Sequence, residues 1–106
     1  MRFVLFSQFL LITAGLFFLA GCVTAKPPIE DYTLADAAIK AAKSVQSVRY
    51  SPGYWHQAEE LFRQARILYR EREYDQAREL FIQARGAAEK AENSARLLRQ
   101  KNGDIL

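Results

Sequence analysis

The chain has 106 residues, with 15 basic and 12 acidic residues, one histidine and one cysteine. This length holds one small domain. The formal net charge of +3 is too balanced to indicate nucleic-acid binding. One cysteine and one histidine exclude an intrachain disulfide and leave too few ligands for a zinc site.

The N-terminal residues have the layout of an export signal. Arg2 supplies a positive charge, residues 3–18 form an apolar stretch, and the small residues Ala20 and Gly21 follow it. Roughly 20 apolar residues can also span a bilayer, so an uncleaved membrane helix is the competing interpretation.

The residues Leu19-Ala20-Gly21-Cys22 resemble the lipobox of bacterial lipoproteins. The resemblance implies cleavage between Gly21 and Cys22 and acylation of the Cys22 thiol, whose lipid chains would hold the protein on a membrane. In such lipoproteins an aspartate after the cysteine commonly retains the protein at the inner membrane. Val23 stands there, which for a Gram-negative source implies the outer membrane, with the domain on the periplasmic face.

Removal of residues 1–21, the signal peptide, from the 106 leaves 85 residues. Residues 22–32 lack hydrophobic periodicity and include the pair Pro27-Pro28, which stiffens an extended chain. We therefore assign residues 22–32 to a lipidated tether and residues 33–106 to a helical domain.

The first helix of this domain is expected at about residues 34–48. Thr33, with Asp36 three residues later, is an approximate capping box. Apolar residues at spacings of three and four then predict one buried helical face. That face consists of Leu34, Ala37, Ala38, Ala41, Val45 and Val48.

The second helix is expected at about residues 52–70, because Ser51-Pro52 is a strong start signal. A polar turn follows at residues 71–73. The apolar stripe of this second helix is Trp55, Ala58, Phe62, Ala65 and Tyr69.

The third helix is expected at about residues 75–100, before the stop signal Asn102-Gly103. Its apolar residues recur at heptad-like spacing. They include Ala77, Leu80, Phe81, Ala84, Ala87, Ala88, Ala91, Ala95 and Leu98. Three helical patterns and no strand pattern predict an all-α fold.

The second and third helices resemble one tetratricopeptide repeat. The match rests on the turn at residues 73–77, Glu-Tyr-Asp-Gln-Ala, and on Leu61, Ala65, Leu68, Tyr74, Ala77, Phe81 and Ala84. Arg72 and Glu89 replace the small turn residue and the final proline of the repeat, and stacked repeats need about three copies. The expected architecture is therefore a small three-helix bundle built on a tetratricopeptide-like antiparallel hairpin.

The sequence predicts no catalytic residue, no metal site, no cofactor and no small-molecule substrate. It has no glycine-rich phosphate loop and no nucleophile beside a base, and a thin helical domain has little room for a pocket. His56 is expected in solvent. The whole chain also resembles small uncharacterised bacterial lipoproteins with a domain of unknown function, which implies no reaction.

Four side chains are candidates for partner binding. Arg63, Arg66 and Arg70 lie within a narrow arc of the second helix, and Tyr54 is the aromatic residue expected outside the core. Such an arc could bind an acidic partner or anionic lipid. The alternative is an ordinary solvated face, since Glu59 lies one turn before Arg63.

Two functions without catalysis remain. The first, which we favour, is an interaction module for another envelope or periplasmic protein. The second is a structural envelope lipoprotein that acts by oligomerisation or by non-covalent contact with the cell wall. Braun-type lipoproteins join the wall through a C-terminal lysine, whereas this chain ends in Asp104-Ile105-Leu106, so covalent attachment is not expected.

Overall fold

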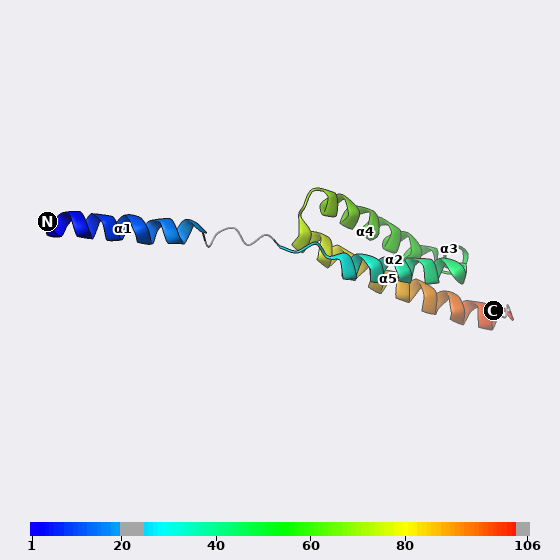
Figure 1. The fold of residues 1–106 in the computed structure, drawn as a ribbon. Coiled ribbons are helices and arrows are strands. Elements are labelled where there is room, and N and C mark those ends of the chain that lie inside the picture. The colour runs from blue at the N-terminus through cyan, green and yellow to red at the C-terminus, as the bar shows by residue number, and fades with distance from the viewer. Residues whose placement is uncertain (20–24, 104–106) are drawn as a thin grey trace.

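The computed structural model describes residues 1–19 and 25–103, and this part of the chain is helical without strands, in agreement with the predicted all-α class. The described part contains five helices (Figure 1). They are α1 (Arg2–Leu19), α2 (Ile29–Ser44), α3 (Ser47–Tyr50), α4 (Pro52–Arg70) and α5 (Tyr74–Lys101).

The N-terminal helix α1 makes no contact with the other helices (Figure 1). Its apolar side chains from Phe3 to Ile12 are exposed. None of the helices in the described residues is long and apolar enough to cross a membrane. The predicted cleavage, lipidation and sorting residues, Gly21, Cys22 and Val23, lie outside the described residues.

Helix α2 begins at Ile29, so the last residues of the predicted tether are helical. The backbone N–H of Tyr32 donates to the Pro28 carbonyl at 3.0 Å, and two acidic residues occupy the first turn, where the helix dipole favours them. The predicted capping box is therefore wrong. Thr33 lies inside the helix, and its hydroxyl donates to the Ile29 carbonyl at 2.8 Å.

Helix α2 ends at Ser44, before the predicted residue 48. Gln46 has a φ of 61°, in the left-handed region, and its N–H donates to the Lys43 carbonyl at 3.0 Å. A left-handed residue closes the last turn of a helix and redirects the chain. The single turn α3 then leads into α4.

The buried face of α2 differs from the predicted one. Leu34 and Val48 are exposed, whereas Ala35 and Ala42 are fully buried. Alanines occur all around this helix, so their spacing does not define which face packs. The ring of Tyr32 provides the largest apolar surface on the packed side and sets the register. That side consists of Tyr32, Ala35, Ala38, Ile39 and Ala42.

Helices α4 and α5 are joined by a short turn and lie side by side, and α2 packs chiefly against α5 (Figure 1). Trp55 and Phe81 are the large side chains at the centres of two core clusters. Alanines let the helix backbones approach closely around them. The fully buried alanines of α5 are Ala77, Ala84, Ala88, Ala91 and Ala95.

The turn between α4 and α5 closes around Arg72, whose φ is 61°. The Arg72 N–H donates to the Tyr69 carbonyl at 3.1 Å, and the Glu73 N–H donates to the Leu68 carbonyl at 2.9 Å. This is the Schellman pattern of hydrogen bonds, in which the left-handed position usually holds glycine. An arginine therefore occupies a conformation that is costly for a residue with a Cβ atom.

A candidate partner-binding groove between α2 and α4

A groove runs between α2 and α4, because both helices pack chiefly against α5 and touch each other at few positions. Two neighbouring hollows form it, and Arg66 borders both of them. We call this surface the α2–α4 groove. Its lining is Ile29, Tyr32, Thr33, Ile39, His56, Glu59, Glu60, Phe62, Arg63, Arg66, Tyr69 and Arg70.

Aromatic rings form the floor of the groove. The centroid of the Tyr32 ring lies 5.5 Å from Phe62, 6.1 Å from Tyr69 and 5.1 Å from Phe81. The edge-on contact with Phe81 has a favoured geometry for an aromatic pair, and the other two contacts are tilted. Phe81 is fully buried, while the other three rings are half-buried and border the hollows. The rings of the floor therefore pack on one another, and all but Phe81 are still partly exposed.

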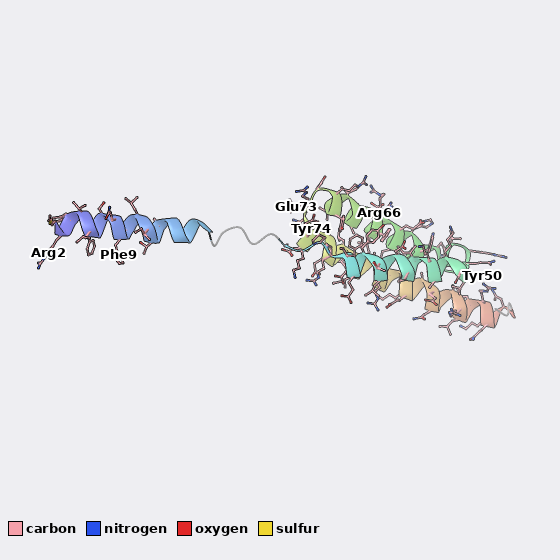
Figure 2. The ribbon with its side chains drawn as sticks, in the orientation of Figure 1. Arg2, Phe9, Tyr50, Arg66, Glu73 and Tyr74 are labelled. Carbon is pink, nitrogen blue, oxygen red and sulfur yellow. The ribbon has the colours of Figure 1, made fainter. Side chains whose placement is uncertain are left out.

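The hollow nearest the α4–α5 turn has a volume of about 760 Å³. Its lining residues include Arg66 and Arg70 and no aspartate or glutamate. The Arg66 guanidinium carbon lies 5.2 Å from the centre of the Phe62 ring, a cation–π contact that orients the group. Figure 2 shows Arg66 on α4, with Glu73 and Tyr74 at the adjoining turn and Tyr50 at the other end of the domain.

Among the arginines of α4 and α5, Arg66 and Arg70 are the two whose guanidinium groups make neither an ion pair nor a hydrogen bond within the described residues. Arg99 donates to the Val45 carbonyl at 3.2 Å. The remaining four are paired with carboxylates: Arg63 with Glu60, Arg78 with Asp31, Arg85 with Glu89, and Arg96 with Glu92, at N–O distances of 2.6 to 3.1 Å. Arg66 and Arg70 both line the same hollow.

Arg63 is held by its own helix. Its Nη2 and Nε donate to the two carboxylate oxygens of Glu60 at 2.6 and 3.1 Å. Hydrogen bonds from Arg63 and from Gln64 lower the pKa of the Glu60 carboxyl, and the hydrogen bond to Glu60 raises the pKa of Arg63. Of the three arginines in the predicted arc, Arg63 is therefore paired with a carboxylate, whereas Arg66 and Arg70 are not.

A comparison with protein families identifies this helical domain. Residues 30–103 match the family described as Domain of unknown function (DUF4398). The chain belongs to this family. No curated protein and no solved structure matches the chain. The match covers nearly all of α2 to α5, so the groove lies entirely within the DUF4398 domain, except for Ile29.

The DUF4398 domain does not bring all four predicted partner-binding residues together. Tyr54 is 44% exposed, as expected, but it borders a separate hollow with Lys90, Leu97 and Lys101 on α5. The four candidates therefore belong to two surfaces. The side chain of His56 is 69% exposed, and its nearest carboxylate oxygen, from Glu59, is 3.9 Å away.

Two groove residues, Ile29 and Tyr32, lie within the predicted tether, and Tyr32 contributes a ring to the floor. The sequence does contain a helical signal that includes Tyr32, because Tyr32, Ala35, Ile39 and Ala42 follow at spacings of three and four. Within residues 1–19 and 25–103 of this DUF4398 protein, no cluster of three or more acidic, histidine or cysteine side chains could hold a metal. The groove offers instead cationic donors beside an apolar floor.

Proposed function

We propose that this protein is a lipid-anchored envelope protein whose helical domain binds another envelope or periplasmic protein through the α2–α4 groove. The supporting observation is the placement of Arg66 and Arg70, without carboxylate partners, beside the half-buried rings of Tyr32 and Tyr69. Aromatic and arginine side chains carry much of the binding energy at protein interfaces. The proposal includes no enzymatic activity.

The anchor in this proposal is lipid attached to Cys22 after removal of the signal peptide. The lipobox resemblance supports it, and Val23 supports the outer membrane, with the domain on the periplasmic face. Since α2 begins at Ile29, the tether runs from Cys22 to Pro28. Six extended residues reach at most about 20 Å, so the domain would remain close to the membrane surface.

The proposed interaction module is a tetratricopeptide-like hairpin that α2 completes as a three-helix bundle. Ala65 and Ala77 have no exposed surface, which agrees with the close helix crossing typical of this repeat. Tetratricopeptide-like hairpins present grooves between helices to partner proteins. The α2–α4 groove is likewise an open groove between helices, and packed aromatic rings form its floor.

The anchor is tested by Cys22→Ser, which should abolish incorporation of radiolabelled palmitate and leave uncleaved precursor. Val23→Asp should move the protein from outer-membrane to inner-membrane fractions on a sucrose gradient. Palmitate incorporation into the Cys22→Ser protein would exclude the lipobox, and an unchanged gradient would remove the basis for the outer-membrane proposal.

The interaction is tested by crosslinking in native envelopes. The double variant Arg66→Glu/Arg70→Glu should keep its helicity and lose the crosslinked partner. The matched control Arg85→Glu/Arg96→Glu changes the same charge on exposed positions of α5 and should retain it. Retention of every partner by both variants would favour the structural lipoprotein that acts by oligomerisation or non-covalent wall contact.

A further inference from the structure

We infer that the α2–α4 groove accepts a short acidic segment of the partner protein. A carboxylate of that segment would lie between Arg66 and Arg70, and an adjacent apolar side chain would lie on the rings of Tyr32 and Tyr69. This inference rests on the proposed function and specifies the chemistry of the partner that the groove recognises.

The positive charges of Arg66 and Arg70 favour an acidic ligand. Arg66 and Arg70 stand one helical turn apart, so their Cβ atoms lie about 5–6 Å from each other on one face of α4. No carboxylate borders the hollow that they share, although four of the other arginines on α4 and α5 have one. An acidic side chain from another protein would supply the missing partner through charge-assisted hydrogen bonds, which are among the stronger ones in proteins.

The apolar surface beside these arginines favours an apolar side chain next to the carboxylate. Ile29 is 63% exposed at the rim of the hollow, and the rings of Tyr32 and Tyr69 are half-buried on its floor. The ring contacts and the stacking of Arg66 on Phe62 hold these groups in place before a ligand arrives. A preorganised site loses less side-chain entropy on binding. An apolar side chain beside the carboxylate would therefore add affinity.

The length of the groove sets the size of the segment. From His56 to Arg70, α4 advances by 14 residues, which corresponds to about 21 Å along the helix axis. An extended chain covers that distance in roughly six residues. Glu59 and Glu60 border the opposite end from Arg70, so the acidic residues of the segment are expected at the Arg70 end.

A segment of protein fits this surface better than an anionic membrane does. Glu30, Glu71 and Glu73 are exposed at the same end of the domain as Arg70, together with the cations Lys26 and Arg72. A flat anionic bilayer would therefore meet charges of both signs on this surface. A side chain that enters the hollow meets a lining that includes Arg66 and Arg70 and no aspartate or glutamate.

The test measures peptide binding by the full-length chain in a zwitterionic detergent, with protein-free micelles as the blank. The probe is a short fluorescent peptide of glutamates with interspersed tyrosines, and its counterpart carries glutamines in place of the glutamates. Fluorescence anisotropy should show at least roughly tenfold tighter binding of the glutamate peptide. Added salt should weaken this binding.

Two variants locate the site. Arg66→Gln/Arg70→Gln should weaken binding of the glutamate peptide by about tenfold or more, whereas Arg85→Gln/Arg96→Gln should leave it unchanged. Both variants remove two positive charges from exposed positions, so a difference between them cannot come from net charge. Circular dichroism should show wild-type helicity for both, since exposed substitutions usually change stability by about 0.5 kcal/mol or less.

Three results would overturn the inference: equal binding of the two peptides, equal effects of the two variants, or no binding of either peptide. Binding to vesicles that contain phosphatidylglycerol, with loss in Arg66→Gln/Arg70→Gln and no peptide binding, would assign the hollow to lipid instead. If the envelope partner depends on Arg66 and Arg70 but the glutamate peptide does not bind, the proposed function stands and this inference fails. If the peptide binds at this site and no envelope partner is crosslinked, the proposed function fails alone.

Discussion

Replacement of Tyr32 by alanine should loosen α2 from the rest of the helical domain. Tyr32 is the only aromatic residue in α2, and its ring contacts Phe62 and Tyr69 of α4 and Phe81 of α5. No other side chain of α2 joins both long helices through aromatic contacts. The substitution therefore removes the main anchor of the first turns of α2.

The expected loss of stability follows from burial and ring contacts. Replacing a fully buried aromatic residue by alanine typically costs about 3–5 kcal/mol. Tyr32 is half-buried, which lowers the expected cost to about 2–3 kcal/mol. In a domain of this size each kcal/mol shifts the melting temperature by roughly 4–8 °C, so the midpoint should fall by roughly 10–20 °C.

The assay is thermal unfolding of the full-length chain in detergent, followed by circular dichroism at a helical wavelength. Tyr32→Phe keeps the ring and should melt near the wild-type temperature. Tyr54→Ala is the matched control, because Tyr54 is exposed and has no ring contact in the described residues. Its midpoint should change little.

An unchanged midpoint for Tyr32→Ala would refute the packing described for α2. It would mean that the first turns of this helix do not dock on α4 and α5. The floor of the α2–α4 groove would then also be misplaced, since Tyr32 is the residue that α2 contributes to it. A fall equal to that of Tyr54→Ala would lead to the same conclusion.

The remaining predictions concern the hairpin. Ala77→Leu should destabilise the domain by about 1–3 kcal/mol because Ala77 is fully buried between helices, and an unchanged urea midpoint would contradict that packing. Arg72→Gly should stabilise it by about 0.5–1 kcal/mol in the same assay, since glycine adopts the left-handed conformation of Arg72 without steric cost. Glu60 should titrate by NMR below the ordinary pKa of a glutamate, and Arg63→Gln should raise that pKa. The folded-state pKa of Glu60 is lowered, so the stabilisation from its pair with Arg63 is present above the unfolded pKa of Glu60. It is lost as the pH falls through the folded-state pKa. Equal Glu60 pKa values in the wild type and in Arg63→Gln would refute the pairing.

The all-helical class and the long helices could be predicted from the sequence because their signals are strong and local. Ser51-Pro52 marks the start of α4, and the polar turn at residues 71–73 separates it from α5. Large side chains such as Trp55 and Phe81 define one face unambiguously, since no comparably apolar face competes with them. Both lie in the core, as the periodicity predicts.

The bounds and the buried face of α2 could not be predicted correctly, because the capping and periodicity signals in its sequence are weak. Alanine is compatible with a buried or an exposed position, so the spacing of alanines in α2 supports more than one face. Pro27-Pro28 favours an extended tether, but Pro28 directly precedes the first turn of α2. The structure resolves the ambiguity through Tyr32, which packs on rings from two other helices.

The helical periodicity and the charges of α4, including the arc that contains Arg66 and Arg70, can be predicted from the sequence alone. The sequence could not determine that these two arginines share a hollow, because one wall of that hollow belongs to α2. The register of α2 and the separation of Tyr54 from the arginines depend on the packing of the helices. The physical reason is that periodicity is a property of one helix, whereas a groove depends on how two helices pack against a third.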